Sequence, residues 1–219
     1  MFIEIANLFS PEELKSIVER VNRLEFGDGR ATAGWSARLV KFNEQAVAGE
    51  ELLSLRQLLE EAILRDPIFQ VTVRPKELAP LVVARYGPGQ TYGSHVDNAI
   101  IGNIRTDVSF TLFLNAPDEY EGGELIIETL RGDEAIKLSA GTLFVYPATT
   151  LHRVSPVTAG NRVVAVGWAR SFIRSAEDRE LLFDLDTVRR VLFDRQGKTD
   201  ETDLLSKVTA NLLRRWIED

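Results

Sequence analysis

The chain has 219 residues, of which 44% are hydrophobic and 27% charged, and these values are typical of one globular domain with extensions. It has no cysteine, which excludes disulfides, thiolate metal sites and a cysteine nucleophile. The net charge of −7 argues against a nucleic-acid partner, because lysine and arginine must neutralise the phosphates of a polyanion. No stretch approaches the run of about 18 apolar residues that a membrane span needs, and the first residues lack the basic start and long apolar run of a signal peptide, so we expect a cytoplasmic protein with no membrane partner.

Two helices are predicted in the N-terminal third of the chain. Ser10 is a typical N-cap, Pro11 suits the first helical position and Glu13 completes a capping box. Apolar residues then recur at helical spacing as far as Leu24. A second helix with a broad apolar stripe is expected over Glu50–Leu64, where an Asp-Pro pair stops it. Beyond that pair we expect extended structure.

The segment between these helices is irregular and rich in glycine. We expect a strand over residues 36–42. Trp35 precedes it, isolated among the glycines. The sequence leaves two interpretations of this side chain open, a mobile flap over a binding site or an aromatic that plugs the edge of the core.

The middle of the chain contains short runs of branched and aromatic residues, separated by glycine and proline. The predicted strands are Leu81–Tyr86, Val108–Leu114, Glu124–Glu128, Ala135–Leu138, Leu143–Tyr146 and Arg162–Trp168. Several short strands with turns between them indicate an all-β sandwich or barrel.

The pattern becomes helical again near the C-terminus. Ser175 is expected to cap a helix that extends through Leu192, and Thr199 or Thr202 to cap another that reaches Ile217. This helical pair either buttresses the sheet as a small subdomain or forms the interface of a homodimer.

The histidine content singles out one candidate metal site. The chain has two histidines, His95 and His152, and they are its only strong nitrogen ligands. On an extended strand, His95 and Asp97 project from the same face with Cα atoms roughly 6.5–7 Å apart. Two histidines and a carboxylate form the facial triad of non-haem Fe(II) oxygenases, which leaves positions open for substrate and oxygen.

A lone His-x-Asp pair is a weak signal, because such a pair on a strand is more often solvated or satisfied in a turn. Two neighbours in the sequence strengthen it. His152 follows a predicted strand and a proline turn, and Arg162 stands ten residues later at the start of another strand. The competing interpretation makes Arg162 a surface charge at a strand end.

Five motifs along the chain point to a known family. They are Asp28–Gly34, Arg85–Asn98 with its Tyr-Gly-Ser-His-Val-Asp sequence, Tyr120–Leu125, Tyr146–Val157 and Leu181–Asp186. With these motifs the sequence resembles the Fe(II)- and 2-oxoglutarate-dependent dioxygenases of the prolyl-4-hydroxylase-like branch, and in particular the bacterial PKHD-type hydroxylases.

The resemblance implies a fold and the roles of the site residues. The fold would be a mainly β core, a double-stranded β-helix or jelly roll, with N-terminal helices and a C-terminal helical pair, α+β overall. Its divisions would be residues 1–76, a dioxygenase core over 77–171 and a helical subdomain over 172–219. The iron ligands and catalytic centre would be His95, Asp97 and His152, and Arg162 would bind the distal carboxylate of 2-oxoglutarate.

One position departs from the pattern of the family. Related enzymes often use a tyrosine to help hold 2-oxoglutarate where this chain has Phe113, which has no hydroxyl. Tyr86 or Thr111 would then supply the missing hydrogen bond. The competing interpretation of Tyr86 is an aromatic at a strand end that packs on its neighbours.

The activity that the resemblance implies is a hydroxylation. It would consume O2 and 2-oxoglutarate, release succinate and CO2, and use ascorbate to rescue oxidised iron. The substrate, a small molecule or a peptide, is not readable from these residues. The alternative function is a non-catalytic module that senses the metal or the keto acid.

Overall fold

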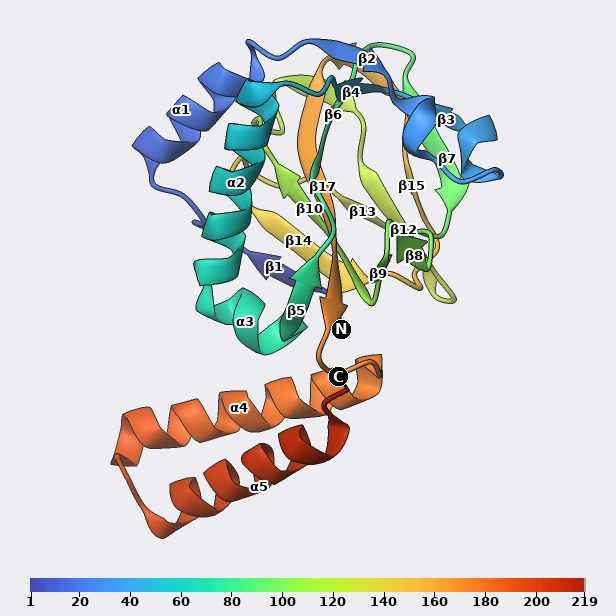
Figure 1. The fold of residues 1–219 in the computed structure, drawn as a ribbon. Coiled ribbons are helices and arrows are strands. Elements are labelled where there is room, and N and C mark those ends of the chain that lie inside the picture. The colour runs from blue at the N-terminus through green and yellow to red at the C-terminus, as the bar shows by residue number, and fades with distance from the viewer. Residues whose placement is uncertain (219) are drawn as a thin grey trace.

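Two antiparallel β-sheets face each other in the computed structural model, which describes residues 1–218 (Figure 1). The larger sheet runs in the order β1 (Ile3–Ile5), β14 (Leu143–Pro147), β10 (Val108–Phe113), β17 (Arg162–Ser171), β6 (Val82–Tyr86), β4 (Glu44–Ala46) and β2 (Phe26–Asp28), with β5 (Pro75–Leu78) also paired to β17. The smaller sheet runs in the order β13 (Gly132–Ile136), β12 (Leu125–Thr129), β15 (His152–Val154), β7 (Thr91–His95) and β3 (Lys41–Phe42). Two further ribbons are β11 (Tyr120–Gly122) with β16 (Val157–Gly160), and β8 (Ile100–Ile101) with β9 (Ile104–Arg105).

Three helices cover the outer face of the larger sheet: α1 (Pro11–Val21), α2 (Glu50–Arg65) and α3 (Pro67–Val73) (Figure 1). Because side chains alternate along a strand, β10 serves two cores. Phe110 and Leu112 join the helices in the first core, whereas Phe113 packs in a second core between the two sheets. The second core also takes Val164 from the larger sheet and Ile127 from the smaller one. This two-layer arrangement confirms the predicted jelly-roll core.

The N-terminal helix begins as predicted. Ser10 accepts a hydrogen bond from the backbone of Glu13, and the Glu13 carboxylate accepts one from Ser10 N at 2.8 Å. The second predicted helix is also present, but extended structure does not follow it. The Asp66 carboxylate accepts hydrogen bonds from the backbone N–H groups of Ile68 and Phe69, and this cap starts α3 directly. The β-branched residues of α3 lower its helix propensity, and the cap with buried Phe69 overrides that preference.

The prediction of a strand over residues 36–42 is largely wrong. Two short 3₁₀ helices, η1 (Gly29–Thr32) and η2 (Ala37–Leu39), occupy most of the region, and only Lys41–Phe42 pairs as a strand. The Trp35 side chain is 88% exposed, so it does not plug the edge of the core. Its role as a flap stays a prediction.

Each strand predicted in the middle of the chain is present, with ends shifted by a few residues. The N-terminal segment contributes strands as well as helices, since β1, β2, β4 and β5 join the larger sheet and β3 joins the smaller one. These short strands have mixed or polar sequences without a clear alternation. They form because they pair with neighbouring strands, which a local sequence pattern does not show.

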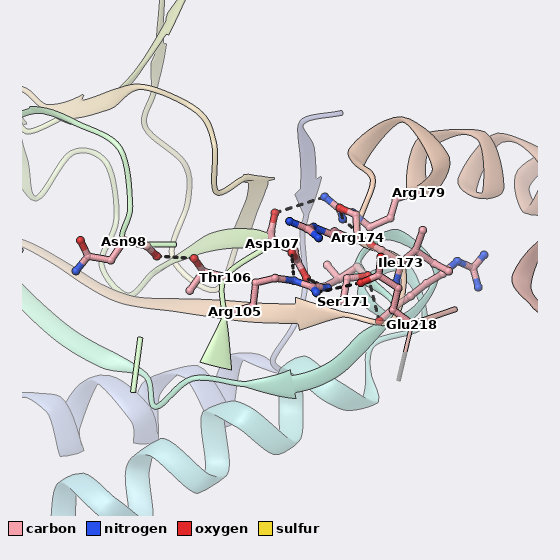
Figure 2. Close-up of polar contacts among 11 residues, drawn as sticks. Asn98, Arg105, Thr106, Asp107, Ser171, Ile173, Arg174, Arg179 and Glu218 are labelled. Atoms are coloured by element: carbon pink, nitrogen blue, oxygen red, sulfur yellow. Dashed lines mark hydrogen bonds and ion pairs between the residues drawn. The ribbon is translucent and has the colours of Figure 1, made fainter. Parts of the chain in front are cut away.

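The C-terminal helices α4 (Ala176–Gln196) and α5 (Asp200–Trp216) form a hairpin that projects from the body beside α3 (Figure 1). Ser175 caps α4, and Thr199 caps α5 in a capping box with Thr202, as predicted. Arg179 anchors the hairpin, because its guanidinium is buried and donates to the backbone oxygens of Ile173, Arg174 and Asp107 (Figure 2). Of the helices within residues 1–218, none combines the length and the apolar character that a membrane crossing requires.

Candidate metal centre and its cavity

The two histidines lie opposite each other on neighbouring strands of the smaller sheet. His95 ends β7, His152 begins β15, and the two are register partners. Their ring centroids are 4.3 Å apart. Together with Asp97 they offer one ligand atom each, and these three atoms all lie within 4.8 Å of one another. The fold thus brings together the three residues that the sequence singled out.

Asp97 reaches this cluster in a different way from the one expected. It lies two residues beyond the end of β7, in a loop rather than on the strand. Its carboxylate oxygens are each 4.0 Å from one histidine, Oδ1 from His95 Nε2 and Oδ2 from His152 Nε2. The Ser109 hydroxyl donates a hydrogen bond of 2.6 Å to Asp97 Oδ2 from β10. A contact between the sheets therefore orients this carboxylate.

Both imidazole rings are held so that one nitrogen faces the cluster. The Nδ1 of His95 lies 2.8 Å from the Gly93 carbonyl and that of His152 lies 3.0 Å from the Thr150 carbonyl. A carbonyl can only accept, so each Nδ1 carries a proton, and in the neutral form of the ring Nε2 presents a lone pair toward Asp97. Burial, followed by the nearby His152, lowers the pKa of His95 to about 4, which keeps that ring neutral at pH 7.

This donor set fits a divalent metal. Two neutral imidazoles and one carboxylate suit Fe(II), and carbonyl partners on the far ring nitrogens are the usual support of histidine ligands. The Tyr146 hydroxyl lies 3.4 Å from His152 Nε2, beside the position that the metal would take. Burial raises the pKa of Tyr146, so this hydroxyl stays protonated.

The cluster opens on a cavity of about 450 Å³ that is lined by residues of both sheets and, at Arg56, by a residue of α2. Arg162, Tyr86 and Thr111 also line it, on neighbouring strands of the larger sheet. The structure thus places all six site residues predicted from the sequence around one cavity.

Arg162 is a buried cation rather than a surface charge. Its side chain is only 1% exposed at the start of β17. Its guanidinium carbon lies 5.1 Å from the centre of the Tyr86 ring and 5.7 Å from that of Phe113. Within residues 1–218 it forms no ion pair with a carboxylate, and its Nε has no hydrogen-bond partner. An unpaired charge at this depth is costly, so the cavity is suited to an anion.

Tyr86 and Thr111 are both buried and line the same cavity as this arginine. Tyr86 is its register partner on β6, and burial raises the pKa of the phenol, which stays protonated. Thr111 points to the same side of the larger sheet from β10. Which of these two hydroxyls binds 2-oxoglutarate stays a prediction.

Sequence reasoning missed several residues that complete the site. Tyr92 stacks on His95 with ring centroids 3.6 Å apart and an angle of 17° between the planes. Ser109 supports Asp97, Tyr146 lies beside His152, and Lys41 lines the cavity from β3. Ser109 could have been found from strand alternation, because it is two residues before Thr111 and shares its face.

The loop that carries Asp97 is tied back to the body at its far end (Figure 2). The Thr106 hydroxyl donates to the Asn98 carbonyl at 2.5 Å. The next residue, Asp107, accepts hydrogen bonds from Arg105 and from the backbone N–H of Ser171. One polar network thus joins the loop that carries Asp97, the end of strand β17 and the C-terminal hairpin.

Comparison with known proteins places the same residues in a recognised family. A family model described as the 2OG-Fe(II) oxygenase superfamily matches residues 81–170, which include the triad and Arg162. Among solved structures, a prolyl-4-hydroxylase of Pseudomonas putida aligns with a TM-score of 0.57 and 20% identity, covering 78% of this chain and 92% of that one. A Trichoplax adhaerens prolyl hydroxylase, solved with a hypoxia-inducible-factor peptide fragment, has a TM-score of 0.57 and 17% identity, covering 83% and 86%. At such identities these likenesses show the fold.

Sequence relatives extend the likeness to the whole chain. A PKHD-type hydroxylase of Picosynechococcus sp. is 51% identical over 219 residues, which is all of both chains. One from Gloeothece citriformis is 49% identical over 220 residues, again with full coverage of both. Because an identity near one half extends through the helices as well as the core, the chain belongs to the PKHD-type hydroxylases of the 2OG-Fe(II) oxygenase superfamily.

Proposed function

We propose that His95, Asp97 and His152 hold Fe(II) in this hydroxylase and that Arg162 binds the distal carboxylate of 2-oxoglutarate. The observation that carries the proposal is the placement of an unpaired, buried arginine in the same cavity as the His-Asp-His cluster. The flat guanidinium can donate two parallel hydrogen bonds to a carboxylate. A hydroxyl that lines the same cavity, that of Tyr86 or Thr111, then supplies a further hydrogen bond.

Fe(II) with bound 2-oxoglutarate would activate O2, so that one oxygen atom enters a C–H bond of the substrate and the other enters succinate, with release of CO2. The chain itself has three tasks. The carbonyl partners of both histidines fix which nitrogen faces the metal. Ser109 orients the carboxylate ligand. Apolar residues that line the cavity between the sheets, among them Leu125 and Val154, keep water away from this part of it.

The substrate is proposed to be a small molecule or a peptide, because the Trichoplax adhaerens enzyme, which shares the fold, was solved with a peptide. Ascorbate is proposed as the reductant that restores oxidised iron, on the strength of the family alone. We also propose that the C-terminal subdomain, described here over residues 172–218, pairs two copies of the chain, because its helical hairpin leaves apolar side chains exposed.

The experiment measures iron binding and succinate formation separately. Anaerobic titration should give one Fe(II) per chain, and addition of O2 and 2-oxoglutarate should give slow succinate release even without substrate. His152→Ala removes a nitrogen ligand that no other histidine replaces, so both signals should be lost. Arg131→Ala, in an exposed turn, is the matched control and should change neither.

Two outcomes would contradict the proposal in different ways. Unchanged iron stoichiometry in His152→Ala would show that the metal is held elsewhere. A wild-type chain that binds iron and 2-oxoglutarate but forms no succinate, with or without added cell extract, would be a sensor of the metal or the keto acid.

A further inference from the structure

A second buried cation faces the metal end of the cavity. The Lys41 side chain, on edge strand β3, is only 6% exposed and lines the cavity. Its Nζ lies 5.1 Å from the centre of the Tyr92 ring, which itself stacks on His95. β3 and β7 are neighbours in the smaller sheet (Figure 1), so this placement follows from the pairing of Lys41 with Tyr92.

The ammonium group of Lys41 is poorly satisfied by the protein. It donates one hydrogen bond of 2.9 Å, to the Thr32 hydroxyl in η1. In the part of the chain that the structure describes, it forms no ion pair with a carboxylate. A lysine has three N–H donors, so two remain for a ligand. Burial lowers the pKa of Lys41 to about 8, although Asp97 and Asp28 act against the shift.

The charges that line the cavity are unbalanced. Among the described residues that line it, three are cationic, Lys41, Arg56 and Arg162, and Asp97 alone is acidic. Divalent iron and doubly negative 2-oxoglutarate cancel each other, so two positive charges remain once both are bound. The whole chain has a net charge of −7, so this excess is local to the cavity.

Arg56 is another cation of the cavity that has no carboxylate partner among the described residues. It reaches the cavity from α2, forms no ion pair within residues 1–218, and its Nε is buried without a hydrogen-bond partner. With Arg162 assigned to 2-oxoglutarate, Lys41 and Arg56 are the cations without an assigned partner. Lys41 is the one in contact with the aromatic ring that supports a metal ligand.

We infer that the substrate of this hydroxylase is an anion whose negative group pairs with Lys41. The inference rests on the proposed function, because it takes 2-oxoglutarate to occupy the position beside Arg162. The substrate class is a compound or a peptide with a carboxylate, or a group of similar charge, near the C–H bond that is oxidised. An anion bound there would satisfy the two free donors of Lys41 and reduce the positive excess.

The test uses probe pairs that differ only in charge. N-acetyl amino acids carry one carboxylate, and their primary amides are otherwise identical and neutral. Each probe is added to the full chain loaded with Mn(II) and saturating 2-oxoglutarate, and broadening of its proton NMR signals by the paramagnetic metal reports binding close to the site. No turnover is needed. Calorimetric titration of 2-oxoglutarate on the same samples shows whether each variant is folded.

The wild-type chain should bind the acids about 10-fold or more tightly than the amides, the size expected of a charge-assisted hydrogen bond. Lys41→Met should remove this preference, and Lys41→Arg should retain most of it. Lys207→Met, on the exposed face of α5, is the matched control and should leave it unchanged.

Equal binding of acids and amides, or binding of neither at millimolar concentration, would overturn the inference, as would an intact preference in Lys41→Met. Failure of 2-oxoglutarate to bind the Mn(II)-loaded wild-type chain is a separate result, because it contradicts the proposed function instead.

Discussion

Arg162 is the residue whose replacement should separate co-substrate binding from metal binding. Arg162→Lys keeps the charge and loses the planar fork. Loss of a charge-assisted pair is worth about 1.5–3 kcal/mol, so we expect the 2-oxoglutarate concentration needed for half-maximal succinate formation to rise by about 10- to 150-fold. Iron content should stay at the wild-type value. Full activity at low 2-oxoglutarate in both Arg162→Lys and Arg162→Ala would show that the keto acid binds elsewhere.

The charge of Lys41 should lower the free energy of unfolding of the metal-free chain, because it is buried without a carboxylate partner. Its pKa is lowered from 10.5 to about 8 by burial, so below pH 8 the native state holds an unfavourable charge. Between pH 8 and 10.5 the unfolded state binds more protons, stability rises with pH and the cost disappears. Lys41→Met should therefore raise the free energy of unfolding by about 1–3 kcal/mol at pH 7.

Urea unfolding in the presence of a chelator, at pH 7 and again near pH 10, measures this effect. The gain of Lys41→Met over wild type should shrink at the higher pH. A loss of stability at pH 7 would mean that the hydrogen bond to Thr32 matters more than the buried charge, and that Lys41 is a structural residue.

At the scale of elements, strand β10 joins the helical core to the metal centre. Phe110 and Leu112 pack against the helices, whereas Ser109 on the other face donates to Asp97. Replacing a residue that hydrogen-bonds to a metal ligand typically lowers metal affinity by about 10- to 100-fold. Ser109→Ala should weaken Mn(II) binding by a factor in that range while the melting temperature changes little. Thr106→Ser, which keeps its hydroxyl, is a suitable control. An unchanged dissociation constant would show that Asp97 is positioned by its backbone alone.

The network around Asp107 should stabilise both the Asp97 loop and the hairpin (Figure 2). The Asp107 carboxylate is nearly buried and accepts hydrogen bonds from Arg105 Nε at 2.8 Å and Ser171 N at 2.9 Å. Asp107→Asn should cost about 1–3 kcal/mol in urea unfolding, the penalty for leaving buried donors unpaired. Glu218→Gln removes only the more exposed pair with Arg105, so it should cost at most about 1 kcal/mol. Equal costs for the two variants would contradict this ranking.

At the scale of the whole molecule, the projecting hairpin sets the expected oligomeric state. Leu181, Val188 and Val191 lie at helical spacing on α4 and are 52%, 50% and 41% exposed. Apolar side chains gathered in this way favour association. We expect the chain to sediment as a dimer at micromolar concentration, and Val188→Glu to shift it to the monomer. Thr187→Glu, at the adjacent exposed position, should leave it a dimer. A wild-type monomer at all concentrations would refute the proposed pairing.

Local signals in the sequence determined much of this molecule. The caps at Ser10, Ser175 and Thr199 were predictable because each involves hydrogen bonds within three residues. Branched and aromatic runs located the strands of the β core. The metal cluster was predictable by elimination, since a chain with two histidines offers few ways to ligate iron, His95 and His152.

Only the tertiary structure decided features that depend on contacts between distant residues. It placed Asp97 in a loop held by Ser109, packed Phe69 of α3 against Phe110, and buried Lys41 beside the metal cluster without a carboxylate. A lysine on a short strand gives no local sign of burial, because its environment depends on which strand pairs with it. The sequence around Arg162 likewise gives no local sign of burial. Whether this arginine is a surface charge or a buried cation depends on whether the second sheet covers it.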